Sequence, residues 1–395
     1  MMLDPHIVEW LNLLTRWIHM IVGVAWIGAS FYFNWLEGHL EREGEKPAGV
    51  AGDIWSVHGG GFYHAQKYEV APEKMPETLH WFKWEAYTTW ISGMVMLFIV
   101  YYLNAGAYMV DPNVADISPT TAIVIGLTTI IVGWVVYDRL CKSKLADNPK
   151  LLGLVGYLLV VFVAFVLFQF IGGRAAYIHI GAMLGTIMVA NVAMVIMPGQ
   201  RRLVAALIAG ETPDANDGKQ ALIRSRQNNY ITLPVLFLMI SNHYPSTFGN
   251  QYGWLIIAAL IPIGVGVRHY YNLKHKGNHA TWMLVAAALA FAVVAWFAAP
   301  KTLEAPAGGA NSAMAMDIVQ KHCVACHSSA PTDKIFSAAP NGVMFDTLEE
   351  VQRHAVSIKA RSVDTNSMPL GNPTGMTDEE RAILGTWIAE GAGGD

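Results

Sequence analysis

The chain has 395 residues, of which 53% are hydrophobic and only 14% are charged. So high an apolar share with so little charge is typical of integral membrane proteins rather than of soluble domains. The formal net charge of −4 at pH 7 argues against a general nucleic-acid-binding surface, because such surfaces are basic.

Apolar stretches suited to a lipid bilayer fill the first 300 residues, and a helix needs about 20 residues to cross it. We count eight, near residues 10–34, 84–104, 120–138, 151–171, 176–197, 229–243, 252–270 and 280–299. The sixth is short and contains Pro234, and a start near Gln227 would lengthen it. We therefore expect an all-α fold, with a polytopic transmembrane helix bundle of about eight spans over residues 1–299.

Three histidines lie in or at the ends of these spans. His19 is well inside the first, His179 is near the start of the fifth and His243 ends the sixth. Ionisable groups inside a span are costly and point to function. Because neutral imidazoles are common iron ligands, a pair of them could hold a b-type haem between two helices. The alternatives are that they bind a small substrate, bind only each other or sit as ordinary residues of the membrane interface.

A second polar set gathers at the opposite ends of the spans. It includes Asn34, Asn191 and Asn229, and residues of the loop "DIWSVHGGGFYHAQKYEV", in which "HGGGF" can also be a plain turn. The candidate catalytic or substrate-binding residues of this set are Gln66, Lys67, Glu85, Gln227 and Asn228. Lys83, Arg226 and Arg268 are interpreted as charges that fix the orientation of the chain.

The distribution of lysine and arginine predicts the orientation. These residues are concentrated in the loops after the first, third, fifth and seventh spans, and on the other side only Arg174 breaks the pattern. Positively charged loops remain in the cytoplasm. Both termini are therefore expected on the periplasmic side of a bacterial inner membrane.

A small soluble domain is predicted after the spans. The stretch "KTLEAPAGGANS" is rich in Pro, Gly and Ala and indicates a linker, placed at residues 300–312, before a domain at 313–395. The stretch "KHCVACHSS" holds Cys323, Cys326 and His327 in the C-x-x-C-H spacing of c-type haem attachment. In bacteria this haem is attached in the periplasm, where the charge pattern also places the C-terminus.

The iron of such a haem would be bound by His327 on one face and by a methionine on the other. Met368 and Met376 are the candidates, and we favour Met368 because Pro369 stiffens its loop. Met376 is tied to a helix start, directly before the capping-box residues Thr377 and Glu380. A zinc site would need two more Cys or His at matching spacing.

Two resemblances extend this interpretation. The pattern "SMP…MTDEE…WI" resembles the small class I cytochrome c domains. The segments "RWIHMIVGVAWIGASFYFNW", "IWSVHGGGFYHAQKY", "LHWFKWEAYTTWISG" and "RQNNYITLPVLFLMISNHYP" resemble the bacterial membrane-bound urate oxidases, also called urate hydroxylases. This second resemblance implies an eight-helix domain joined to a cytochrome c. It also implies oxidation of urate to 5-hydroxyisourate, with electrons leaving through haem c to a downstream cytochrome c or terminal oxidase.

A second function stays open from the sequence. The chain could be a non-catalytic electron-transfer subunit that links a partner dehydrogenase or a quinol to a terminal oxidase. Urate as substrate rests on the resemblance alone, whereas the residues themselves indicate a membrane redox protein with a c-type haem.

Overall fold

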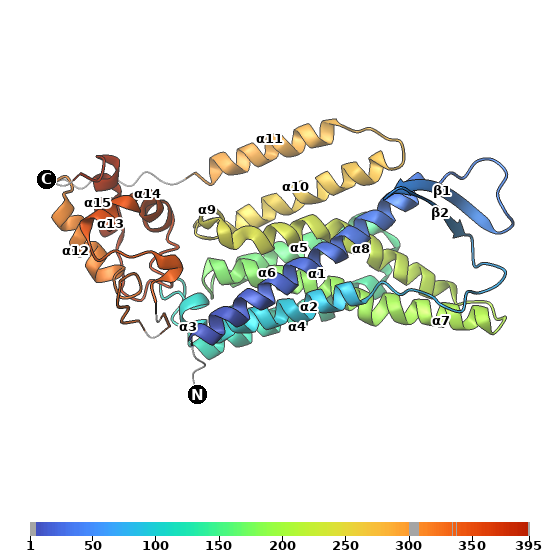
Figure 1. The fold of residues 1–395 in the computed structure, drawn as a ribbon, viewed down its shortest axis with the longest axis horizontal. Coiled ribbons are helices and arrows are strands. Elements are labelled where there is room, and N and C mark those ends of the chain that lie inside the picture. Colours follow the sequence, from blue (N-terminus) through green and yellow to red (C-terminus); the bar gives the residue numbers. More distant parts are fainter. Residues whose placement is uncertain (1–4, 300–307, 334, 337, 394–395) are drawn as a thin grey trace.

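The computed structural model describes residues 5–299, 308–333, 335–336 and 338–393. Long helices run side by side, and a group of short C-terminal helices covers one end of them, near the N-terminus of α1 (Figure 1). The predicted linker at 300–312 begins with residues 300–307, which lie outside the described residues.

Helices overlap each of the eight predicted spans. The long ones are α1 (Pro5–His39), α2 (Trp84–Leu97), α4 (Pro119–Lys142), α5 (Pro149–Leu167), α6 (Gly173–Ala190), α7 (Met197–Ile208), α8 (Ala215–Ile240), α10 (Gly253–Lys274) and α11 (Trp282–Phe297). Short helices and 3₁₀ turns lie between them: α3 (Ala105–Tyr108), α9 (Pro245–Phe248), η2 (Lys144–Asp147) and η4 (Ser241–His243). Two π-helical segments lie among these long helices: η1 (Phe98–Tyr102) continues α2, and η3 (Asn191–Ile196) joins α6 to α7.

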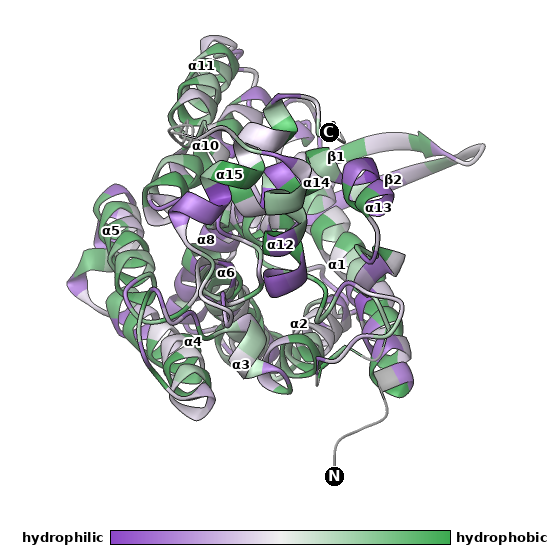
Figure 2. Ribbon diagram, turned by 90° about the vertical axis from the view of Figure 1, so that its left-hand side faces the viewer, coloured by the Kyte–Doolittle hydropathy of each residue, from purple (hydrophilic) through white to green (hydrophobic). Residues whose placement is uncertain are grey.

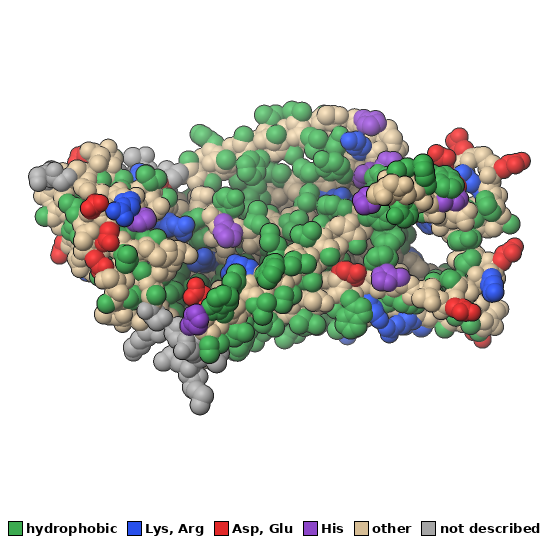
Figure 3. All heavy atoms as spheres, viewed as in Figure 1, with side chains coloured by type: hydrophobic (Ala, Val, Ile, Leu, Met, Phe, Trp, Pro, Cys, Tyr) green, Lys and Arg blue, Asp and Glu red, His purple; other side chains and the backbone are tan. Residues whose placement is uncertain are grey.

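Within the described residues, five helical stretches are long and apolar enough to cross a membrane. They are α1, α4, α5, α10 and the continuous stretch Gly173–Ile208. On the face that Figure 3 shows, apolar side chains form a broad belt over the helices, and most charged side chains lie toward its two ends. Large apolar side chains of the long helices, among them Val24, Ile131 and Phe162, are more than half exposed. These features are compatible with a membrane protein, because lipid chains would cover such a belt.

The segment after α1 departs from the all-α expectation. It forms an antiparallel hairpin of β1 (Val50–His58) and β2 (Gly61–Tyr68). Gly59 and Gly60 make the turn with φ of +58° and +80°, a backbone that glycine adopts at little cost and that two-residue hairpins require. Trp55 and His64 are opposite each other on the strands, and their rings stack with centroids 4.3 Å apart. Cross-strand pairs of this kind stabilise a hairpin.

Helix α6 is the centre of the bundle, since it contacts α2, α4, α5 and α8. Tyr177, His179 and Ile180 on this helix are completely buried. Small residues let its neighbours approach closely: a Cβ added to Gly126 of α4 would lie 2.4 Å from Nε2 of His179. Close packing through small residues is how helices associate where lipid gives no hydrophobic drive.

The C-terminal helices form a second core of their own. They are α12 (Ser312–His322), α13 (Leu348–Arg353), α14 (Ala355–Ile358) and α15 (Asp378–Ala389), with η5 (Pro340–Gly342) and the π-helical η6 (Lys359–Val363). The first helix, α12, packs against the last, α15. The capping box predicted at Thr377 and Glu380 is present at the start of α15. Seen from this end, the group lies over the ends of the long helices (Figure 2).

Candidate functional site

A cavity of about 550 Å³ lies among the long helices, in the half of the bundle nearer the hairpin. Its walls come from the second half of α1, from residues 80–82 before α2, from the α6–α7 junction and from α8. On α8, the lining residues Ser225, Asn228 and Thr232 share one face, because they are three and four positions apart.

The lining is mostly aromatic and aliphatic, with a few polar groups. Trp26 and Phe33 of α1 line the cavity together with Trp81. The polar lining residues are Ser30, Asn34, His80, Gln200, Ser225, Asn228 and Thr232. An apolar cavity with a small number of convergent polar groups is the usual form of a small-molecule site. This cavity is therefore the candidate binding site of the helical domain.

The π-helical segment η3 contributes to the same wall. Val192 and Ile196 on it line the cavity, and Asn191 at its start is completely buried. A π-helical turn inside an α-helix shifts the side chains that follow it and frequently marks a functional site. Here it places the amide of Asn191 behind the lining residue Asn228.

A buried arginine reaches the cavity wall through two amides. Arg224 of α8 is fully buried, and its Nη1 donates to Oδ1 of Asn191 at 3.1 Å. Nδ2 of Asn191 donates in turn to Oδ1 of Asn228 at 2.8 Å, and Nδ2 of Asn228 donates to the carbonyl of Met188 at 2.9 Å. Nη2 of Arg224 also forms an ion pair of 2.8 Å with Asp138. Arg224, Asn191 and Asn228 are called the Arg224 chain below.

The opposite wall has a chain with the same chemical order. Nε of Arg268 donates to Oδ1 of Asn229 in a short hydrogen bond. Nδ2 of Asn229 donates to Oδ1 of Asn34 at 3.0 Å and to Asn272 at 3.1 Å, and Nδ2 of Asn34 donates to the carbonyl of Ser30 at 2.6 Å. Arg268, Asn229 and Asn34 are called the Arg268 chain. It ends, as the Arg224 chain does, on an asparagine that lines the cavity.

Arg268 is more than the orientation charge that the sequence suggested. Its side chain is only 4% exposed and its guanidinium lies 4.0 Å from the centre of the Phe31 ring. The sequence did contain a signal for the role of Arg268, namely asparagines and an arginine in the buried parts of α8 and α10. Such polar groups are rare in apolar helices. The aromatic walls had no comparable signal, because Trp and Phe are common throughout the chain.

Of the five candidate residues from the sequence, Asn228 alone is among those that line the cavity. Gln66 and Lys67 lie on β2, where Lys67 pairs with Glu37 at 2.7 Å. Glu85 is in the first turn of α2. Oε1 of Gln227 accepts a hydrogen bond of 3.7 Å from Sγ of Cys141. The structure thus brings Asn228 together with Asn34 and Asn191 of the same predicted polar set, and with aromatic residues that the sequence did not single out.

The three histidines have separate surroundings. Nδ1 of His19 lies 3.0 Å from the carbonyl of Thr89, which leaves its Nε2 with a lone pair. Nδ1 of His179 donates to the carbonyl of Ala175 at 2.8 Å, and its Nε2 accepts from the hydroxyl of Tyr102 at 3.2 Å. His243 is exposed in η4. Among the described contacts none joins two of these histidines.

The C-x-x-C-H residues follow directly after α12. Burial raises the pKa of the Cys323 thiol to about 12 and that of Cys326 to about 11, so both are neutral thiols rather than reactive thiolates. Nδ1 of His327 lies 3.0 Å from the carbonyl of Val343. Donation of the Nδ1 proton to this carbonyl leaves the lone pair on Nε2, the tautomer that a metal-binding histidine needs.

The two methionines differ in their surroundings. Met376 is 4% exposed and belongs to the core of the C-terminal helices. Met368 is half-buried, and its loop is held from two sides: its N–H donates to the carbonyl of Arg361 at 2.9 Å, and its carbonyl accepts from Nη1 of Arg381 at 2.9 Å. Fixing the backbone while leaving the side chain outside the core suits a residue that must present its sulfur.

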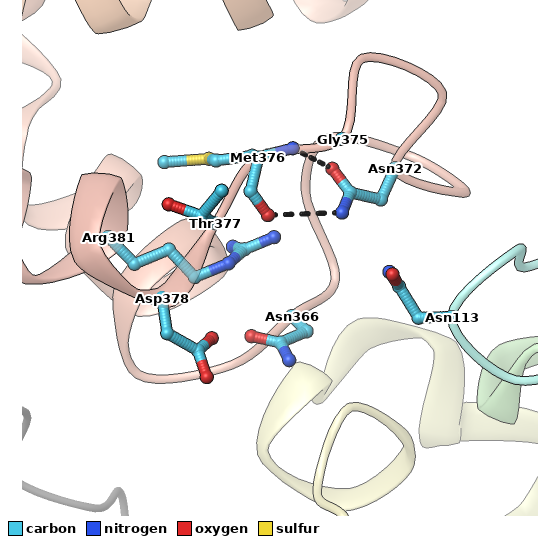
Figure 4. Close-up of a pocket in the computed structure, with 8 residues that line it drawn as sticks. All are labelled: Asn113, Asn366, Asn372, Gly375, Met376, Thr377, Asp378 and Arg381. Carbon is cyan, nitrogen blue, oxygen red and sulfur yellow. Dashed lines mark hydrogen bonds between the residues drawn. The ribbon is translucent and has the colours of Figure 1, made fainter.

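A second cavity, of about 390 Å³, lies where the C-terminal helices meet the long ones. Figure 4 shows Asn113, from the segment between α3 and α4, facing Asn366 and Arg381 across it. Asn372 closes one side through two hydrogen bonds to the backbone of Met376, of 2.8 and 3.2 Å. Its lining is mostly polar, so it is not a candidate site for an apolar ligand.

Comparison with known proteins gives one result. The family model described as urate oxidase N-terminal matches residues 5–299, which is most of the chain and includes the whole candidate cavity. No curated protein and no solved structure matches the chain.

The contact between His179 and Gly126 leads to a stability prediction. Gly126→Ala should destabilise the protein by about 1–3 kcal/mol, because the added Cβ overlaps the imidazole in a packed interface. Gly185→Ala, on the same helix as His179, is the matched control, since nothing lies within 4 Å of its added Cβ. Thermal unfolding of the two purified variants measures the difference, and equal midpoints would contradict the packing described.

Proposed function

The chain belongs to the urate oxidase N-terminal family, and from this membership we propose that it oxidises urate to 5-hydroxyisourate and delivers the electrons to a c-type haem in its C-terminal domain. The membership itself indicates a urate-related oxidoreductase. The single observation that carries the proposal further is the cavity, which combines aromatic walls with the amides of Asn34 and Asn228.

Urate suits this cavity chemically. It is a flat purine ring and a monoanion at neutral pH, with carbonyl and N–H groups around its edge. Aromatic side chains such as Trp26 and Trp81 can stack on its faces, and Asn34 and Asn228 can bond its edge. The cavity volume of about 550 Å³ lies within the usual range for small-molecule sites.

The overall reaction balances as an oxidation coupled to the addition of water. The urate anion loses two electrons, water adds at C5, and one proton is released as neutral 5-hydroxyisourate forms. The oxidant is a one-electron acceptor used twice, and a haem iron is such an acceptor. The electrons then pass to a downstream cytochrome c or to a terminal oxidase.

The residues present suit a covalent haem. Cys323 and Cys326 would attach the porphyrin, and His327, through Nε2, and the sulfur of Met368 would bind the iron. When bound, the haem would supply one-electron transfer. The residues contribute position: Val343 orients the imidazole of His327, and Arg381 holds the loop of Met368. With the charge pattern, this domain is proposed to face the periplasm.

The function is tested with the purified full chain in detergent. Urate added without oxygen should reduce the haem, seen as the sharpened absorption bands of ferrous haem c, and 5-hydroxyisourate should form at one molecule per two electrons. A protein that stays oxidised with urate but is reduced by a quinol would instead be an electron-transfer subunit.

The methionine ligand is tested by two volume-conserving substitutions. Met368→Leu should remove the sulfur ligand, lower the haem potential and abolish the weak long-wavelength band of ferric iron bound to methionine. Met376→Leu should leave both unchanged, because its side chain belongs to the core and leucine fills a similar volume. Redox titration of the two variants decides the assignment, and the reverse pattern would identify Met376 as the ligand.

A second, b-type haem in the helical domain remains a proposal, and His19 is the ligand that the geometry favours. Its Nδ1 bond to the carbonyl of Thr89 leaves Nε2 available, whereas both ring nitrogens of His179 are bonded. Acidified acetone extracts b-type but not covalent haem. We expect extractable haem from the full chain, its loss in His19→Ala and its retention in the exposed His243→Ala. A chain without extractable haem contradicts the proposal.

A further inference from the structure

The two arginine chains fix which atoms the cavity amides present. A guanidinium has N–H donors and no acceptor, so the amide beside it must turn its oxygen toward the arginine. That amide then directs its NH₂ outward, and the next amide must turn its oxygen to meet it. Asn34 and Asn228 stand at the ends of these chains, so both have their oxygens engaged and their NH₂ groups directed away from the arginines.

Each of these NH₂ groups uses only one of its two N–H donors within the part of the protein that the structure describes. An amide NH₂ has two hydrogens. One is used by the carbonyl of Ser30 for Asn34 and by the carbonyl of Met188 for Asn228. Both asparagines line the cavity, so the remaining hydrogen of each is available to an acceptor on a ligand there.

The charges of the two chains differ. Arg224 has a counter-charge in Asp138 at 2.8 Å, a carboxylate that Lys142 also contacts at 2.7 Å. Arg268 has no acidic partner among residues 5–299 and the described part of the C-terminal domain, and its buried Nη2 has no hydrogen-bond acceptor there. A buried cation without a counter-charge is costly in an apolar helix bundle. The cost falls when an anion binds nearby.

We propose that the Arg268 chain makes the cavity selective for anionic planar rings, with Arg268 as a positioning residue that holds the Asn34 amide as a donor and supplies the unneutralised charge. The inference rests on the proposed function and deepens it, since urate is an anion at neutral pH and neutral purines have similar shape. Arg268 acts through Asn229 and Asn34, because it does not itself line the cavity.

The test compares urate with hypoxanthine, a purine that is neutral at pH 7, by calorimetric binding to the full chain in detergent. Arg268→Met should weaken urate binding about tenfold and change hypoxanthine binding less than about twofold. Arg268→Lys keeps the charge and should recover part of the preference. The matched control is Arg201→Met, which removes an exposed charge on α7 and should change neither affinity.

A second substitution keeps the test informative if Arg268→Met does not fold. Asn229→Asp retains the oxygen that Arg268 contacts and nearly the same shape. It also neutralises Arg268 and removes the NH₂ that holds Asn34, so the preference for urate should fall as in Arg268→Met. Thermal unfolding confirms that the variants compared are folded.

The outcomes separate the two proposals. An unaltered protein that neither binds nor oxidises urate overturns the proposed function and this inference with it. If the unaltered protein binds urate and Asn229→Asp keeps the preference over hypoxanthine, only the inference is overturned. If Arg268→Met changed the affinities for urate and hypoxanthine equally, Arg268 would have only a structural role, and the inference would likewise be overturned.

Discussion

The hydrogen bond from a buried guanidinium to a buried amide is the constraint on which the candidate site depends. Arg224 is 0% and Arg268 4% exposed in a bundle that is otherwise apolar. Because a guanidinium can only donate, it sets the direction of every hydrogen bond after it. The hydrogen bonds that the two guanidiniums donate to Asn191 and Asn229 leave just one orientation for the cavity amides. Arg224 and Arg268, which do not line the cavity themselves, thus determine that Asn228 and Asn34 direct their NH₂ groups away from the arginines.

Helix α6 connects this constraint to the rest of the bundle. It is packed on four sides, and the π-helical segment η3 at its end turns Asn191 toward Arg224. A loosely packed helix could not hold that amide in one orientation. The close contact of Gly126 with His179, at the other end of α6, fixes the helix against α4. Packing and polar network therefore support each other along a single helix.

The sequence was sufficient for the parts of the fold that follow from periodicity and length. Helices lie at each predicted span, and the capping box of Thr377 lies where predicted. The hairpin was missed because few residues of its strands are buried, so the signal was confined to Gly59 and Gly60 at its turn. The cavity could not be predicted, since it depends on how α1, α6 and α8 meet. Asn228 was a candidate as a member of the second polar set, whereas Arg268 was interpreted as a charge that fixes the orientation of the chain.

The positions of the cavity and of the C-x-x-C-H residues set a requirement on electron transfer. The cavity is in the half near the hairpin, and the C-terminal helices cover the opposite end (Figure 1). Along α6 the distance from Asn191, behind the cavity, to His179 is about 18 Å at the usual helical rise. Under the proposed function, an electron leaving the cavity would have to cover at least that distance before it reached the C-terminal domain. A carrier within the bundle would divide this path, and His19, with a free Nε2, is placed on α1, which also lines the cavity.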